Sequence, residues 1–278
     1  MQSQSNLPRH RKKKLSISPD NKDMAETEKE LLQLKKRFAE LAQKSYRQNV
    51  YCFSGFLSLA EQDIFYQVKS GYPETDCMLF GGNDDCERQM ARFGSEEQLG
   101  YEQPFPIVCI RIEPLLAKFA EKLGHRDYLG ACMNLGIERS TLGDILVRPD
   151  CAYLYCTETI APFITENLTK IRHTSVRCSV FTGKAEMLQQ EKIAGEYQVS
   201  SERVDGVAAK VFGLSRAQIL DIFRQKHVFV NGRLQESNSV LLKAGDRVTV
   251  RGYGKFIYGG VTHMTRKGKC SIAVELFH

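Results

Sequence analysis

The dipeptide Asn231-Gly232 restricts the fold of this 278-residue chain more than any other feature. It directly follows the apolar run Val228-Phe229-Val230, and Asn-Gly is the pair that best tolerates the positive φ angles of a two-residue hairpin turn. Farther along, the stretch 247–251 alternates between valine and basic or hydroxyl side chains, which is typical of a strand with one packed face. The sequence therefore predicts a β-ribbon whose free face is basic.

Two short helices are predicted immediately before this ribbon. The first ends at Gly213 and carries apolar residues at helical spacing, namely Val204, Val207, Ala208 and Val211. The second begins with Ser215-Arg216-Ala217-Gln218, a capping box in which the serine hydroxyl and the glutamine each bond a backbone amide. Arg216 lies in its first turn, where the helix dipole favours acids, so this position indicates an external anion.

The positive charge of the chain is concentrated in two segments. The net charge is +6, but residues 201–269 hold thirteen Lys and Arg against five Asp and Glu, and residues 1–20 hold five against one. Residues 21–200 hold 21 basic and 26 acidic residues. Polyanion binding draws its affinity from counterions released around clustered basic groups, so this distribution favours a nucleic acid as the partner.

Four short motifs occur together between residues 203 and 251. They are Arg203-Val204-Asp205, Ser215-Arg216, the run 228–232 and Gly245-Asp246. The set resembles the alpha-L RNA-binding motif, also called the S-four domain, which implies that structured RNA is bound by the second helix and the following hairpin. Where that family usually carries glycine before the hairpin, this chain has Lys226-His227, so the helix end loses its easiest left-handed residue.

We therefore predict an RNA clamp in the C-terminal part of the chain. Its basic side chains are expected at phosphates, and Asn231 and Tyr253 at sugar or base edges. Tyr253 stands between two glycines and could equally fill a join between domains. The predicted RNA-binding residues are Arg203, Ser215, Arg216, Arg224, Gln225, Lys226, Asn231, Arg233, Arg247, Arg251, Tyr253 and Lys255.

Changes in composition divide the chain into four segments. Residues 1–22 are polar and basic without apolar periodicity and are expected to form a disordered arm. Residues 23–71 are predicted as an N-terminal helical hairpin, because apolar residues recur at helical spacing and Ser58 to Glu61 form a second capping box. Residues 72–185 are predicted as a central α+β domain, and residues 186–278 as an S-four domain with a C-terminal β extension.

Strands and helices alternate in the central segment. Apolar runs near 77–80, 107–110, 152–155 and 176–181 predict strands, and helical patterns occupy 115–123, 128–135 and 160–168. This order favours a ferredoxin-like or RRM-like α+β sandwich, and α+β as the fold class of the chain. Small sheets of this kind often bind RNA, although a fold alone does not assign a function.

Further motifs are spread from residue 80 to residue 256. They are Phe80-Gly81-Gly82, the stretches 124–130 and 134–137, Gly143-Asp144-Ile145 and the stretch 251–256. Together they resemble the bacterial YlmH family over nearly everything from about residue 30 onward. The resemblance implies an RNA-binding protein that acts on large ribosomal subunits carrying peptidyl-tRNA, in quality control of stalled translation. Its implied partners are large-subunit ribosomal RNA and, as a second candidate, tRNA; genes of the family also sit near cell-division genes.

Two polar clusters have ordinary structural explanations. Asp127 stands where an acid caps the next helix, which leaves its neighbour Arg126 as a candidate secondary RNA contact. The stretch 81–85 lacks the lysine and the following hydroxyl of a phosphate loop, so a polar turn is favoured over a phosphate or divalent-metal site. Nine cysteines without a Cys-x-x-Cys pair indicate buried, reduced thiols, and we expect no metal and no cofactor.

The main alternative function is an RNA-modifying enzyme, because S-four domains are commonly attached to pseudouridine synthases, RNA methyltransferases and tyrosyl-tRNA synthetases. Arg203 to Gly206 resembles the synthase Arg-Leu-Asp motif, but it falls in a predicted helix of the binding module and lacks the synthase context. No methyl-donor glycine motif, activated nucleophile or acid and base pair can be named, so we predict a non-catalytic protein. A third hypothesis is an interaction factor of the division machinery whose N-terminal helices dock a protein partner.

The remaining composition is typical of a cytoplasmic globular protein. The apolar content of 42% suffices for two or three small cores. No apolar run approaches the roughly twenty residues that span a bilayer. The basic cluster at residues 9–14 is followed by no apolar core of a secretory signal. We expect a cytoplasmic monomer without membrane insertion.

Overall fold

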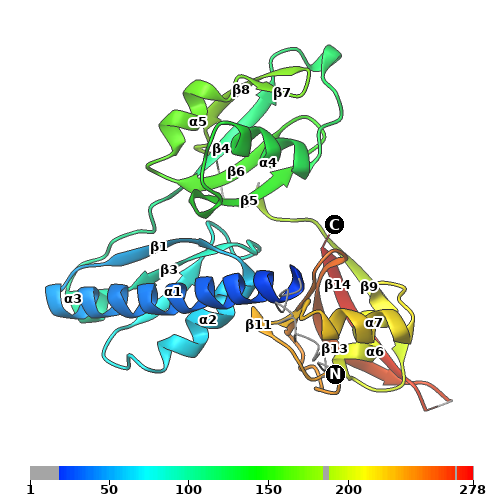
Figure 1. The fold of residues 1–278 in the computed structure, drawn as a ribbon. Coiled ribbons are helices and arrows are strands. Elements are labelled where there is room, and N and C mark those ends of the chain that lie inside the picture. Colours follow the sequence, from blue (N-terminus) through cyan, green and yellow to red (C-terminus); the bar gives the residue numbers. More distant parts are fainter. Residues whose placement is uncertain (1–18, 184–187, 267, 278) are drawn as a thin grey trace, which may run out of the picture.

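The computed structural model describes residues 19–183, 188–266 and 268–277. Its elements form three units that meet at a common junction (Figure 1): an N-terminal unit of residues 19–104, a central unit of residues 107–180 and a C-terminal unit of residues 192–277. Each unit contains its own β-sheet. The chain is therefore a mixed α/β protein, as the sequence predicts. None of the helices in the described ranges combines the length and apolar character needed to cross a bilayer.

The N-terminal unit packs two helices on a three-stranded antiparallel sheet of order β1-β3-β2. Its elements are α1 (Pro19–Gln48), β1 (Cys52–Leu57), α2 (Leu59–Lys69), β2 (Cys77–Phe80), β3 (Gln89–Phe93) and α3 (Glu96–Leu99). Phe38 of α1, Phe65 of α2 and Phe93 of β3 meet in its buried core. The predicted capping box at Ser58 is present and starts α2.

The prediction of a purely helical N-terminal module is wrong. Both helices form, but β1 connects them and pairs with β3, so the strand predicted near residues 77–80 belongs to this unit instead of the central one. The sequence signal of β1 is weak because Gly55 and two serine or cysteine positions interrupt its apolar pattern. The predicted arm 1–22 lies outside the described residues up to residue 18, and its last four residues begin α1.

The central unit is built on a five-stranded antiparallel sheet of order β5-β6-β4-β8-β7. Helices α4 and α5 each connect strands that are not neighbours, which gives the element order β4-α4-β5-β6-α5-β8 of a βαββαβ unit. A helix predicted over 115–123 is reduced to the 3₁₀ turn η1. The elements are β4 (Ile107–Pro114), η1 (Ala117–Phe119), α4 (His125–Asn134), η2 (Arg139–Thr141), β5 (Leu142–Val147), β6 (Ala152–Thr157), α5 (Ala161–Asn167), β7 (Lys170–Ile171) and β8 (Thr174–Val180).

The two faces of this sheet have different partners. Alternate residues of β4 and β6, among them Ile110 and Leu154, face α4 and α5 in one core cluster. The opposite face carries Tyr153 and Tyr155, which pack with Phe56 and Met90 of the N-terminal unit. The N-terminal and central units therefore share an apolar core.

Glycines let these two units approach each other closely. Gly82 has φ +107°, and a Cβ atom at this position would lie 2.4 Å from the ring of Tyr155. A Cβ atom on Gly55 of β1 would lie 2.8 Å from the backbone oxygen of Ser140. No larger residue fits at either contact without displacing its neighbour.

The C-terminal unit is a six-stranded sheet of order β11-β10-β12-β13-β14-β9 with α6 and α7 packed on it. The Asn231-Gly232 hairpin forms as predicted, with both residues at positive φ and Val230 paired with Arg233. The elements are β9 (Lys192–Val199), α6 (Val204–Val211), α7 (Arg216–Arg224), β10 (Val228–Val230), β11 (Arg233–Leu234), β12 (Arg247–Val250), β13 (Gly254–Met264) and β14 (Cys270–Phe277).

Candidate nucleic-acid interface

Helix α7 begins with the predicted capping box. The hydroxyl of Ser215 accepts a hydrogen bond from the Gln218 amide at 3.2 Å, and the Gln218 side chain accepts one from the Ser215 amide at 2.9 Å. This exchange occupies the Ser215 hydroxyl as a cap. Arg216, the next residue, is exposed, and within the described ranges its guanidinium has no hydrogen-bond or ion-pair partner. Arg216 is thus a free cation in the first turn, where the helix dipole adds positive potential.

The C-terminal end of α7 presents further polar side chains to solvent. Arg224 and Gln225 both bond the carboxylate of Asp221 on the same helix, and all three are exposed. Lys226 reaches the exposed Glu236 at 2.8 Å. Such exposed pairs contribute little stability and exchange readily with solvent, so these cations remain available to a stronger anion.

Lys226 also provides the left-handed backbone conformation that ends α7. It adopts φ +58°, the left-handed conformation usually given to glycine, and its amide bonds the carbonyl of Phe223 at 2.9 Å. The missing glycine therefore does not alter the turn into β10. The cost is local backbone strain at Lys226.

Asn231 does not fit its predicted role at a sugar or base edge. Its amide nitrogen donates to Asp246 at 2.8 Å, and its amide oxygen accepts from the Arg247 backbone amide at 2.9 Å. Both polar atoms thus connect the β10–β11 turn to β12. Asn231 therefore fixes the hairpin, and the hydrogen bonds of its side chain are already used within the protein instead of being available to RNA.

Arg203 is similarly engaged within its own turn. It precedes α6, and its guanidinium makes two hydrogen bonds to the carboxylate of Asp205, at 3.1 and 2.7 Å. The Asp205 carboxylate also accepts from the Gly206 amide at 2.7 Å. This paired arrangement neutralises most of the Arg203 charge, which weakens its prediction as a phosphate contact.

Three predicted RNA contacts instead join the C-terminal unit to the N-terminal unit. Arg233 donates to Asp63 of α2 at 2.9 Å and lies over the ring of Tyr66 at 5.1 Å. Arg247 donates to the carbonyl of Asp84 at 2.7 Å. Lys255 is only 9% exposed and donates to the carbonyl of Asp85 at 2.5 Å.

The ring of Phe277 lies among cations at this boundary. Lys192, Arg247 and Lys255 are 5.1, 5.7 and 4.5 Å from its centre, within the usual range of cation–π contacts. The buried carboxylate of Asp85 also faces Lys192, at 3.3 Å, and Arg247, at 3.9 Å. The polar turn that includes Asp84 and Asp85 is therefore a docking point for the C-terminal unit. The prediction that Lys255 grips a phosphate does not agree with this burial.

The turn between β12 and β13 carries the remaining predicted contacts. Arg251 is exposed, its amide bonds the carbonyl of His227 beside α7 at 2.9 Å, and its guanidinium lies 6.0 Å from the centre of the Phe229 ring. Tyr253 is 49% exposed and lies 6.4 Å from the Phe212 ring at the end of α6. This turn extends the exposed basic surface of α7, formed by Arg216, Arg224, Gln225 and Lys226, toward the junction of the three units.

The central unit adds a second basic surface. A groove of about 600 Å³ lies between α4 and the segment after α5, and it is lined by Arg126, Lys170 and Arg172 together with asparagine and threonine side chains. Arg172 has an ion pair with Asp127 at 3.5 Å, whereas Arg126 is exposed without a partner among the described residues. Sequence reasoning found Arg126 but missed Lys170 and Arg172, because the β7–β8 hairpin that carries them gave no motif.

The open face of the central sheet is not free to stack bases. RRM-like sheets bind unpaired bases on aromatic residues of this face. Here Tyr153 and Tyr155 occupy it but are 6% and 3% exposed, because the N-terminal unit and Phe181 of the segment after β8 cover this face. The helix-side groove is thus the accessible basic surface of this unit.

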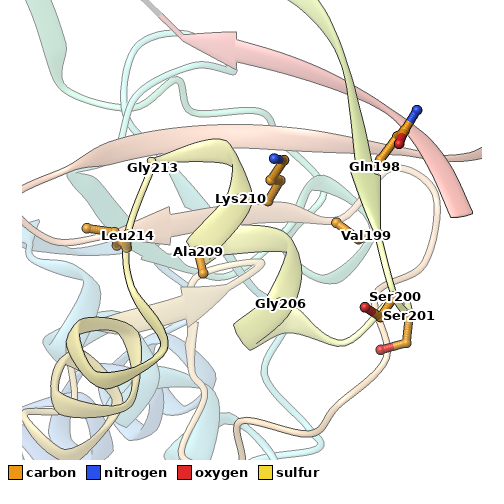
Figure 2. A pocket seen from close by; sticks show the side chains of 9 residues that line it. All are labelled: Gln198, Val199, Ser200, Ser201, Gly206, Ala209, Lys210, Gly213 and Leu214. Carbon is orange, nitrogen blue, oxygen red and sulfur yellow. The ribbon is translucent and has the colours of Figure 1, made fainter. Parts of the chain in front are cut away.

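A further pocket, of about 410 Å³, lies on the C-terminal unit between α6 and the end of β9 (Figure 2). Lys210 is its only charged lining residue, and none of the predicted RNA-binding residues lines it. This composition gives no specific chemistry, and we assign the pocket no ligand.

Burial lowers the reactivity of several thiols. Burial raises the pKa of Cys77 and Cys132 to about 11 and that of Cys109, Cys156 and Cys178 to about 12, which keeps these sulfurs protonated and weakly nucleophilic. In the part of the chain that the structure describes, no group of three His, Cys, Asp or Glu side chains could hold a metal ion.

Three comparisons with known proteins find similarities. Residues 102–184 match the model of a putative RNA-binding domain in YlmH. Over 243 residues the chain is 26% identical to the ribosome-associated protein quality control protein P2 of Bacillus subtilis (strain 168), covering 84% of this chain and 90% of that protein. Among solved structures it is similar to the cell division protein YlmH from Streptococcus pneumoniae, with 17% identity and a TM-score of 0.45 over 63% of this chain and 96% of that chain.

Proposed function

Because this chain belongs to the YlmH family, we propose that it binds structured ribosomal RNA of the large subunit, without modifying it, during quality control of stalled translation. Transfer RNA of the stalled complex is its second candidate ligand. The observation that carries the proposal is the exposed surface of α7, where Arg216 is a free cation and Arg224 and Lys226 are held only by exposed carboxylates. This surface belongs to what we propose is an S-four domain.

The positions of these groups suit a folded RNA. Arg216 and Arg224 are eight residues apart, so about 12 Å of helix separates them, at 1.5 Å per residue. Phosphate contacts of this kind supply the salt-dependent part of affinity and orient the protein on its ligand. We class the central unit as ferredoxin-like and assign its Arg126 groove as a second contact, so that the two basic surfaces bind different parts of one RNA.

Non-catalytic binding is supported by the hydrogen bonds within the segment 203–206, which resembles the catalytic motif of pseudouridine synthases. A catalytic aspartate needs an oxygen available to the substrate. The carboxylate of Asp205 instead receives two hydrogen bonds from Arg203 and one from the Gly206 amide. The pair starts α6 and fixes its first turn.

The N-terminal helices support a protein partner only weakly. Among residues 29–48 of α1, for which exposure is described, the large exposed apolar residues are Leu32 and Tyr46, 55% and 53% exposed. They are fourteen residues apart, or about 21 Å along the helix, so they form no continuous patch. We therefore propose cytoplasmic RNA binding by a monomer ahead of a role in cell division.

The test uses the purified full-length chain and labelled large-subunit RNA. We expect Arg216→Ala to weaken binding roughly tenfold and to reduce the slope of log affinity against log salt by about one. Arg37→Ala on α1 is the matched control, because Arg37 is also exposed but lies on the N-terminal unit. If Arg216→Ala and Arg37→Ala bind alike, α7 is not the interface. Stoichiometric nucleoside modification in the same incubation, measured by mass spectrometry, would overturn the non-catalytic assignment.

A further inference from the structure

A cleft of about 900 Å³ lies where the three units meet, at the junction visible in Figure 1. The N-terminal unit contributes Arg88 to its wall, the central unit contributes His125 and Arg139, and the C-terminal unit contributes Arg251, Tyr253 and Lys255. Its volume lies within the range of about 300–1,000 Å³ typical of small-ligand sites. A cleft of this size admits one nucleotide but no duplex.

The cleft carries excess positive charge. Four of its lining residues are Arg or Lys, against the two carboxylates of Glu87 and Asp144. Asp144 is already occupied, because its oxygens accept hydrogen bonds from the backbone amides of Glu87 and Arg88 at 2.6 and 2.9 Å. Among the described residues, the Asp144 carboxylate forms no ion pair with Arg88 or Arg139.

The two walls hold their arginines rigidly. Arg88 donates to the carbonyls of Leu142 and Phe56 at 3.0 and 2.7 Å, and Arg139 donates to the carbonyl of Leu142 at 2.6 Å. Neither guanidinium has a carboxylate partner in the described ranges. Burial, and then the neighbouring charge of Arg139, lowers the pKa of Arg88 to about 10. A bound anion would relieve this unfavourable accumulation of like charge.

An aromatic side chain completes the site. Tyr253 is half-exposed at the rim of the cleft. Its sequence neighbours Gly252 and Gly254 have no side chains that could cover its ring. Aromatic side chains beside a cationic groove are the arrangement with which proteins bind single strands, since every base has a stacking face. The β12–β13 turn that carries Arg251 and Tyr253 also bonds His227, just after α7, so this wall of the cleft is anchored beside the proposed RNA surface.

We propose that this cleft receives one unpaired nucleotide of an RNA strand, with its phosphate among Arg88, Arg139 and Arg251 and its base against Tyr253. The assignment rests on the proposed RNA-binding function and adds to it a site that none of the single units could form alone. It predicts that the protein distinguishes RNA with an unpaired nucleotide beside a stem from a fully paired stem.

Two substitutions in exposed positions test the cleft from opposite walls. Tyr253→Ala removes the stacking surface, and Tyr253→Phe retains it. His125→Glu introduces a carboxylate in the first turn of α4, where the helix dipole favours an acid, so the fold tolerates the change while a phosphate is repelled. Gln103→Glu is the matched control, because Gln103 is exposed and lines neither the cleft nor the Arg126 groove.

Affinities are measured by fluorescence anisotropy for labelled pentauridylate and for a fully paired RNA stem, with uridine monophosphate as competitor. We expect Tyr253→Ala and His125→Glu to weaken pentauridylate binding about tenfold while stem binding stays within twofold, and Tyr253→Phe and Gln103→Glu to match the wild type. We expect uridine monophosphate to displace labelled pentauridylate only at millimolar concentration, whereas unlabelled pentauridylate should displace it at far lower concentration. This difference would support an RNA strand as the source of the nucleotide.

Unchanged pentauridylate affinity in both cleft variants overturns the proposal, and so does an equal loss for both probes, which would make Tyr253 part of a general surface. Equal affinity for uridine monophosphate and pentauridylate would overturn the strand as ligand. The proposed function fails separately, when Arg216→Ala leaves stem binding unchanged.

Discussion

The ammonium of Lys255 lies 2.5 Å from the backbone oxygen of Asp85, across 170 residues of sequence and the boundary between the C-terminal and N-terminal units. A lysine in an exposed β-strand of a basic domain would ordinarily remain in water. Here it is buried against the turn of another unit and against the Phe277 ring. The charge predicted to meet RNA is therefore part of the contact that positions the C-terminal unit.

Lys255→Ala should lower the free energy of unfolding by about 1–3 kcal/mol, because it leaves the Asp85 carbonyl without its donor and removes a packed side chain. Urea denaturation measures the change. Lys243→Ala, at an exposed position of the same unit, should shift stability by no more than about 0.5 kcal/mol. Equal effects of the two substitutions would show that the boundary contact adds no stability.

Arg233 and Asp63 should be energetically coupled. The Asp63 carboxylate is 13% exposed and accepts from both Arg233 and the Leu234 amide. A double-mutant cycle with Asp63→Ala and Arg233→Ala should give a coupling of about 1 kcal/mol or more, since partly buried pairs exceed exposed ones. The exposed pair Asp221 and Arg224 serves as the comparison and should give at most about 0.5 kcal/mol. A coupling no larger than that of the exposed pair would contradict the assignment.

Lys226→Gly should stabilise the C-terminal unit while weakening RNA binding. The left-handed φ of +58° is strained for lysine and costs about 1 kcal/mol that glycine does not incur. Lys226→Ala removes the same charge but keeps the strain, so it should reproduce only the loss of affinity. Thermal melts and anisotropy on both variants separate the two effects, and a destabilised Lys226→Gly would be inconsistent with the strain.

Lys170→Ala should weaken binding of large-subunit RNA and reduce the salt slope by about one, without changing the melting temperature. Lys170 is exposed and lines the groove beside Arg126 on the central unit. Lys122→Ala is the control, because Lys122 is exposed on the same unit outside this groove. Identical salt slopes for the two variants would remove the groove from the interface.

Glu87→Gln should become more stable than the wild type as pH rises. Burial raises the pKa of the Glu87 carboxyl above its ordinary value of 4.5, and the neighbouring Asp144 raises it further. The folded chain thus binds this proton more tightly than the unfolded chain, so the contribution of Glu87 to stability is present below pH 4.5 and is lost as pH rises through the higher folded pKa. Melting temperatures at pH 4 and pH 7 test this, with the exposed Glu97→Gln as control; an advantage of Glu87→Gln that is independent of pH would contradict it.

The sequence predicted those parts of the fold that local chemistry determines. The capping boxes at Ser58 and Ser215 and the Asn231-Gly232 turn each depend on residues within four positions, and all three form. Strand β1 depends instead on pairing with β3, 32 to 41 residues away, and its own apolar pattern is interrupted, so the sequence does not predict it. Long-range pairing has no local signature in one sequence.

The same distinction applies to the candidate site. The exposed cations Arg216 and Arg251 lie where charge patterning predicted them. The roles of Arg233, Arg247 and Lys255 could not be predicted, because their partners are in α2 and in the 84–85 turn, more than 160 residues earlier in the chain. Asn231 was misassigned because the side chain that favours the turn also bonds Asp246 across it.

The glycine contacts at Gly55 and Gly82 have a mechanical consequence. They hold the N-terminal and central units together as one body, with backbone and aromatic ring in direct contact and with hydrogen bonds from Arg88 to Leu142 and from Asn83 to Tyr155 across the same boundary. The boundary between the N-terminal and C-terminal units is instead held by ion pairs of Arg233 with Asp63 and of Lys192 and Arg247 with Asp85, which an anionic ligand would weaken. We therefore expect any rearrangement on binding to rotate the C-terminal unit relative to the other two units, which move together as one rigid body.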